Sequence, residues 1–164
     1  MALSALPQSM LQQAAQHGDA EAQFQLAIRH AHGRGVPQDY VQAVLWFRRA
    51  AEQGHAGAED SLGVRYATGQ GVPKDEAEAV RWFRRAAERG YAVAQFNLGV
   101  ASAQGQGVAQ DYAQAYLWFA LAAAQGDEMA ANSRDHIAET FTWKELQAAK
   151  LLYHESCHRL RQIT

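Results

Sequence analysis

The chain repeats itself every 36 residues, and this period constrains its fold more than any other feature of the sequence. Four equally spaced glycines mark the period: Gly18, Gly54, Gly90 and Gly126. After each of the first three, alanine, leucine, glycine, valine, aspartate, tryptophan and phenylalanine return at the same offsets without a gap. A fixed period of about 20 to 50 residues is typical of arrays in which each repeat packs against its neighbours. We therefore predict one array of similar units.

Each copy has the apolar spacing of two helices. In the first copy, the second half carries a stripe at i, i+3, i+4, i+7 and i+8, formed by Ala43, Trp46, Phe47, Ala50 and Ala51. That spacing predicts an amphipathic α-helix. The first half places Ala22 and Leu26 on one side of a shorter helix. The two predicted helices of each copy would form a hairpin.

The segment between the two predicted helices has residues that end one helix and begin the next. Gly33 can adopt the left-handed conformation that ends a helix, and Pro37 forces Val36 to be extended. Asp39 follows where its carboxylate can cap the second helix. Val36 is apolar within a loop, and valine returns at positions 72 and 108. We expect this valine to fill the gap between the two helices.

The middle copy carries the most complete motif, Ser-Leu-Gly-Val-Arg-Tyr-Ala-Thr-Gly-Gln-Gly-Val-Pro-Lys-Asp over 61–75, followed by Trp-Phe and Ala-Ala. This motif resembles the Sel-one-like repeat (SLR), a relative of the tetratricopeptide repeat, and the resemblance covers 18 to about 126. The other copies depart modestly, with His30 and Ser102 in place of the tyrosine and Ala109 in place of the proline. The resemblance implies an all-α, right-handed α-α solenoid of tetratricopeptide-like helical hairpins.

The same alignment predicts the domain organisation. A single SLR solenoid domain would cover 1–164, with repeats at 18–53, 54–89 and 90–125. An N-terminal capping helix would lie within 1–17, because Ala14-Ala15 aligns with the alanine pair that closes each repeat. The segment 126–164 would hold a partial repeat and a capping helix. Thr142 and Glu145 have the spacing of a capping box before that last helix, which would run to about Gln162.

Charge and composition disfavour several classes of partner. Lys and Arg total 15 against 17 for Asp and Glu, so no strong field would attract nucleic acid or an anionic membrane. No apolar stretch approaches the roughly 20 residues that span a bilayer. The N-terminus lacks the basic residues of a signal peptide, and Cys157 is the only cysteine, so no intramolecular disulfide can form. These features favour a soluble protein of a reducing, cytoplasmic location.

Two motifs suggest chemistry but have simpler interpretations. Gly-Arg-Gly-Val-Pro at 33–37 is not a phosphate-binding loop, because it follows a helix and lacks Gly-Lys-Ser/Thr. His154, Cys157 and His158 lie at i, i+3 and i+4, where they could bind a soft metal from one side of the last helix. A fourth ligand is missing, and no second histidine completes a His-Glu-x-x-His motif. We predict incidental surface histidines, with no metal and no cofactor.

The aromatic and basic residues of the second helices also allow two interpretations. Trp46, Trp82 and Trp118 could stack on bases or sugars, but their place in the apolar stripe predicts packing in the core. Arg48-Arg49 and the equivalent pair at 84–85 could form a basic stripe for nucleic acid. A glutamate four residues after the first arginine of each pair favours a solvated face with local ion pairs.

The first helices supply the candidate binding surface. If the kinship with tetratricopeptide repeats holds, they line a concave groove, with Leu26 and Ala27 buried and positions 21, 24, 28, 31 and 32 facing outward. Three rows follow at steps of 36 residues: Phe24, Asp60 and Phe96; Ile28, Val64 and Val100; and His32, Thr68 and Gln104. These residues would either bind a peptide with apolar anchors around a basic residue or pack against the neighbouring first helix.

The sequence as a whole favours a binding protein. No nucleophile can be paired with a base, and stacked hairpins offer an extended surface, so we predict a non-catalytic scaffold or adaptor for another protein or peptide. The resemblance implies a bacterial-type cell. One alternative is a stoichiometric inhibitor or immunity protein of one enzyme. The other is a metal-dependent enzyme that uses His154, Cys157 and His158.

Overall fold

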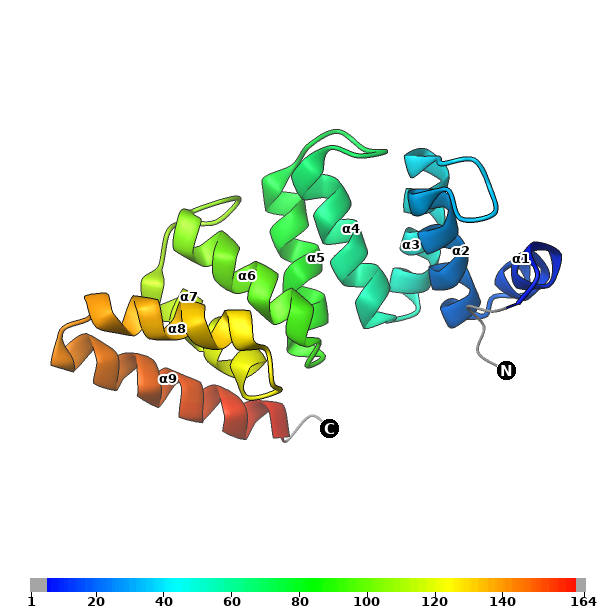
Figure 1. The fold of residues 1–164 in the computed structure, drawn as a ribbon. Helices are drawn as coiled ribbons and strands as arrows, with labels where there is room; N and C mark the ends of the chain where they lie inside the picture. Colours follow the sequence, from blue (N-terminus) through cyan, green and yellow to red (C-terminus); the bar gives the residue numbers. More distant parts are fainter. Residues whose placement is uncertain (1–5, 162–164) are drawn as a thin grey trace. The chain divides into compact units, whose positions relative to one another are not determined.

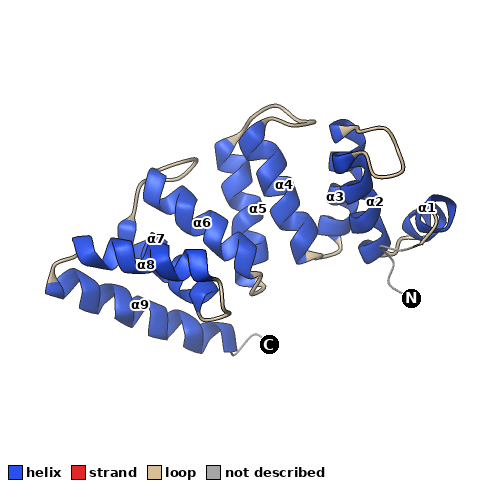
Figure 2. Ribbon diagram, in the orientation of Figure 1, coloured by secondary structure: helices blue, strands red, loops and turns tan. Residues whose placement is uncertain are grey.

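All regular structure in the described part of the chain is helical. The computed structural model describes the backbone of residues 6–161 and the side chains of residues 6–159. Short loops join its helices (Figure 1), and no strand occurs among these residues (Figure 2). The helices are α1 (Gln8–Gln16), α2 (Ala20–His32), α3 (Tyr40–Glu52), α4 (Ala56–Thr68), α5 (Glu76–Glu88), α6 (Ala92–Gln104), α7 (Tyr112–Ala123), α8 (Glu128–Thr140) and α9 (Trp143–Arg161). The prediction of an all-α helical-hairpin fold is confirmed.

The chain divides into two compact units, residues 1–82 and 83–164. The first unit holds α1 to α4 and the first half of α5, and the second holds the rest of α5 and α6 to α9. The parts of the predicted capping segments at 1–5 and 162–164, Gln162 included, lie outside the described residues.

The predicted loop geometry explains where the hairpin helices end and begin. Gly33 ends α2 in the left-handed conformation, with a φ of 67°, and the Asp39 carboxylate accepts a hydrogen bond from the backbone N–H of Gln42 at 3.0 Å. The N–H of Asp39 also donates to the carbonyl of His30 at 2.9 Å, and Asp111 bonds Ser102 in the same way. This hydrogen bond uses only the backbone carbonyl at the tyrosine position of the motif. His30 and Ser102 can therefore replace the tyrosine without losing the bond.

The first unit has two adjoining apolar clusters. Leu11 and Ala15 of α1 are buried against Ala22 and Leu26 of α2, so α1 packs on the first repeat. The larger cluster centres on Phe47, which is 1% exposed. Alanines of α2, α3 and α4 surround it, together with Leu62 and Trp82. Burial of a side chain such as Leu62 contributes roughly 1.5 to 3 kcal/mol to folding.

Helix α7 is the centre of the second unit, where it packs against α6, α8 and α9. Eight of its residues are buried, and its apolar cluster includes Ile137 of α8 and Ala149 of α9. Helix α6 approaches α7 closely at Gly99: a Cβ added there would lie 2.7 Å from the ring of Phe119. Glycine therefore permits a contact that alanine would crowd.

The last helix begins with the predicted capping box. The backbone N–H of Thr142 donates to Oε2 of Glu145 at 2.8 Å, and the N–H of Glu145 donates to Oγ1 of Thr142 at 3.4 Å. The hydroxyl of Thr142, which donates to the same Oε2 at 2.7 Å, and the backbone N–H of Thr142 lower the pKa of the Glu145 carboxyl. Within the described residues, none of the helices has the length and hydropathy needed to cross a membrane.

Candidate interaction faces of the first helices

The three predicted rows differ in how deeply the fold buries them, beginning with the aromatic row. Phe24 is half-buried: its ring lies 5.9 Å from that of Phe47 and stacks on the imidazole of His55 at 4.4 Å. Phe96 is also half-buried, with its ring 5.5 Å from Phe119. Asp60 is 7% exposed. The aromatic row is therefore largely engaged by the fold itself.

The other two rows are more accessible. Ile28, Val64 and Val100 are half-buried, and Ile28 and Val100 pack along the edges of the apolar clusters of their own units. His32, Thr68 and Gln104 are exposed at the ends of α2, α4 and α6. Two outward positions were predicted wrongly. Asp60 is buried, and Ala31 is 3% exposed because it belongs to the cluster around Phe47. Leu26 and Ala27 are buried as predicted.

A polar cluster that the sequence analysis did not identify lies beside Phe24. His55 caps α4, with its Nδ1 accepting from the N–H of Ala58 at 3.1 Å, and its Nε2 lies 2.9 Å from Oε2 of Glu21. The imidazole is thereby held between the Glu21 carboxylate and the Phe24 ring. The hydrogen bond from His55 lowers the pKa of Glu21.

One signal in the sequence could have revealed His55. Positions 19, 55, 91 and 127 are equivalent, and the first and last hold aspartates that cap α2 and α8. A histidine among cap-forming residues keeps an acceptor nitrogen for the helix and leaves its second nitrogen for another partner.

Tryptophan and arginine on the second helices have structural roles. Trp82 and Trp118 are each 9% exposed and Trp46 is half-buried, so the prediction of core packing is confirmed. Arg48 donates to the hydroxyl of Tyr66 at 2.7 Å, instead of forming the predicted pair with Glu52. Arg49 lies over the Trp46 ring at 4.4 Å, a cation–π contact.

The three candidate metal ligands lie along α9. His154 and His158 are exposed and Cys157 is half-buried. Among the residues that the structure describes, no group of three or more His, Cys, Asp or Glu side chains is arranged to hold a metal ion.

The repeats of this chain match a known repeat family. The model of the Sel1 repeat matches three consecutive segments, 20–55, 56–91 and 92–127, which begin two residues later than the predicted repeats. No curated protein matches the chain.

Three solved structures are similar to the chain. One is c5321, described as a protective antigen present in uropathogenic Escherichia coli strains displaying an SLR fold, with 46% identity and a TM-score of 0.74. The match covers 76% of this chain but 27% of c5321, so the chain spans little more than a quarter of that protein. A Sel1 repeat protein from Oxalobacter formigenes has 42% identity and a TM-score of 0.72, over 78% of this chain and 96% of that one. Helicobacter pylori cysteine rich protein B shares the fold, at 21% identity and a TM-score of 0.63, over 79% of this chain and 98% of that one.

Proposed function

The chain belongs to the Sel1 repeat family, and on this premise we propose that it is a non-catalytic scaffold that binds another protein or peptide. Proteins built from this repeat commonly serve as protein-interaction scaffolds. We assign one binding surface to the outward faces of α2 and α4 in the first unit, and another to the outward face of α6 in the second unit.

One observation carries this assignment. On each of these helices a half-buried branched aliphatic residue, Ile28, Val64 or Val100, stands one helical turn before an exposed polar residue. Protein interfaces commonly combine an apolar centre with a polar rim. The backbone groups of a helix are already hydrogen-bonded to one another. Contacts with a partner protein are therefore made by side chains, which the helix holds in fixed positions. Phe24 and Phe96 are packed against other rings, which helps to hold α2 and α6 in place.

The experiment compares two matched pairs of substitutions. The chain serves as bait in a pull-down from the organism that encodes it, and the captured protein is purified for titration calorimetry. Ile28→Ser with Val100→Ser should weaken binding by about 2 kcal/mol or more, because interface energy is concentrated in a few central anchors. Circular dichroism melts must show that this variant remains folded.

The control removes equally apolar side chains from α3. Val41 and Leu45 are 57% and 49% exposed, so Val41→Ser with Leu45→Ser changes a solvent-facing surface outside the first helices. Normal binding by the variant of the first helices, with loss in the α3 variant, would place the interface on the second helices instead. One partner held at nanomolar affinity would favour the inhibitor alternative, whereas several weaker partners would favour the adaptor.

A further inference from the structure

The second unit contains a pocket on the side of its second helices. It has a volume of about 660 Å³ and is lined by the end of α5, by α7 and by α9. That volume lies within the range of roughly 300 to 1,000 Å³ that is usual for ligand sites. It can accept side chains and a short stretch of backbone, but not a folded domain.

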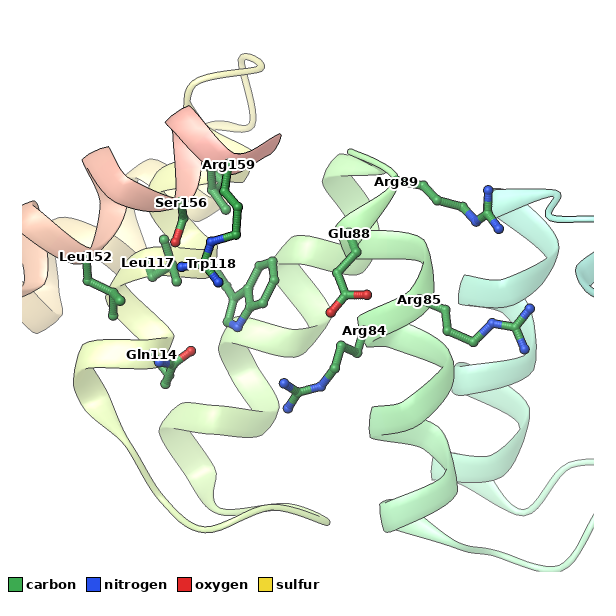
Figure 3. A pocket seen from close by; sticks show the side chains of 11 residues that line it. Arg84, Arg85, Glu88, Arg89, Gln114, Leu117, Trp118, Leu152, Ser156 and Arg159 are labelled. Carbon is green, nitrogen blue, oxygen red and sulfur yellow. The ribbon is translucent and has the colours of Figure 1, made fainter. Parts of the chain in front are cut away.

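Two arginines face the middle of the pocket. Figure 3 shows the side chains of Arg84, from α5, and Arg159, from α9, pointing toward the indole of Trp118. Arg85 and Arg89 also line the pocket but turn away from the indole in the same view. Glu88 is the only carboxylate among the lining residues.

The floor of the pocket is apolar. Trp118 is 9% exposed, so only a small part of its indole is accessible. Leu117 and Leu121 of α7 and Leu152 of α9 continue this floor. An apolar side chain could therefore lie against Trp118 while anionic groups beside it reach the guanidinium groups.

The charge of the pocket opposes the charge of the chain. Among the described residues that line the pocket, Arg84 and Arg159 point toward Trp118 against one glutamate, whereas the protein carries a net charge of −2. Arginine binds carboxylates through two parallel hydrogen bonds, which gives the contact both strength and direction. The pocket therefore selects a ligand that combines carboxylates with an apolar group.

We propose that this pocket, the α5–α7–α9 pocket, binds an acidic peptide segment of a partner protein. A bulky apolar side chain of the segment lies against Trp118, and flanking carboxylates pair with Arg84 and Arg159. Nucleic acid fits less well, because base stacking needs an open ring face and Trp118 is largely buried. None of the described residues that line this pocket belongs to the rows on α2, α4 and α6.

The probe is a fluorescein-labelled peptide with a central phenylalanine flanked by two aspartates on each side, titrated with the full chain by fluorescence anisotropy. Arg84→Ala with Arg159→Ala should weaken binding about tenfold or more, since each substitution removes a charge-assisted contact. The matched control is Arg34→Ala with Arg48→Ala, which removes the same charge elsewhere. Arg48 holds the position of Arg84 one repeat earlier. This control should change the affinity less than about twofold.

A variant that binds the peptide more tightly must be folded, so a gain of affinity tests the pocket without the ambiguity of misfolding. Glu88→Gln removes the one carboxylate of the pocket and should tighten binding of the acidic peptide about threefold. Peptides with serine in place of phenylalanine, or lysines in place of the aspartates, should bind at least about tenfold more weakly. The variant Ile28→Ser with Val100→Ser should bind the peptide normally, so failure of this proposal is distinct from failure of the scaffold proposal.

Several results would overturn the assignment. These are absence of peptide binding at millimolar concentration, equal losses in the pocket and control variants, or equal affinity for the serine or lysine peptides. A single-stranded RNA oligonucleotide that binds more tightly than the peptide, and loses affinity in the pocket variant, would assign the pocket to nucleic acid.

Discussion

Helices α3 and α7 are equivalent in their repeats, yet a side that is exposed in α3 is buried in α7. Leu45 of α3 is 49% exposed, whereas Leu117, its equivalent two repeats later, is 4% exposed. Arg49 of α3 is exposed, and its equivalent Leu121 is 7% exposed. The 36-residue pattern is the same in both helices, so the pattern alone does not decide which residues are core.

The burial in α7 is accompanied by contact with α9. This helix packs against α7, and its Leu152 lines the same pocket as Leu117 and Leu121. The sequence differs accordingly: Arg48-Arg49 becomes Ala120-Leu121. A helix at the end of the array can therefore bury a face that is polar in an earlier repeat. The last repeat carries apolar residues on that face.

The largest change in stability is expected from exchanging the residues at one equivalent position. Leu121→Arg places a charge at a position of α7 that is 7% exposed and should lower the free energy of unfolding by about 3 kcal/mol or more. The reciprocal Arg49→Leu changes an exposed residue and should stay within about 0.5 kcal/mol. Urea unfolding measures both. Equal stability of the two variants would show that this part of α7 is not buried.

Truncating the equivalent leucines tests the same contrast without introducing charge. Leu117→Ala should cost about 2 to 5 kcal/mol, the usual range for a buried leucine, whereas Leu45→Ala should cost about 0.5 kcal/mol or less. The measurement is again urea unfolding. Similar losses at the two positions would mean that burial in α7 adds no stability beyond that of the exposed site in α3.

The first helices offer a subtler test, because α2 has Ala27 where α6 has Gly99. Gly99→Ala should destabilise the chain by about 1 to 2 kcal/mol, because crowding of the Phe119 ring outweighs the gain in helix propensity. Ala27→Gly should also cost about 1 to 2 kcal/mol, through lower helix propensity and the loss of a buried methyl group. Thermal melting of both variants checks the signs. Stabilisation by Gly99→Ala would show that the Phe119 ring yields without strain.

The smallest expected effect concerns pH and the first unit alone. Since the hydrogen bond from His55 lowers the pKa of Glu21 below its ordinary value of 4.5, this contact stabilises the chain fully above that value. The contribution is lost as the pH falls through the lower pKa of the folded state. Glu21→Gln should therefore reduce stability at pH 6 and flatten its acid dependence.

The pH series is measured by urea unfolding between about pH 3 and pH 6, where the carboxylate changes its charge. Glu52→Gln, at an exposed position of α3, is the control. In the second unit Val93 stands where α2 has Glu21, so no equivalent pair can form there. An unchanged acid profile in Glu21→Gln would remove this difference between the units.

The sequence by itself determined the repeat, the two helices of each copy and the residues at their ends. Asp39, Gly33 and the Thr142–Glu145 capping box act on backbone groups within a few residues, so their local spacing suffices to predict them. The core positions of Leu26, Phe47 and Trp82 follow as well, because they recur on one side of a helix.

Tertiary structure alone decided which faces are covered and which side chains meet. The burial of Leu121, the contact of Glu21 with His55 and the pocket around Trp118 each join residues that lie far apart in the chain. Helical periodicity fixes the direction of a side chain about its own helix axis, but not what stands opposite it. The partner across each face is set by how neighbouring helices pack, and that packing depends on the whole unit.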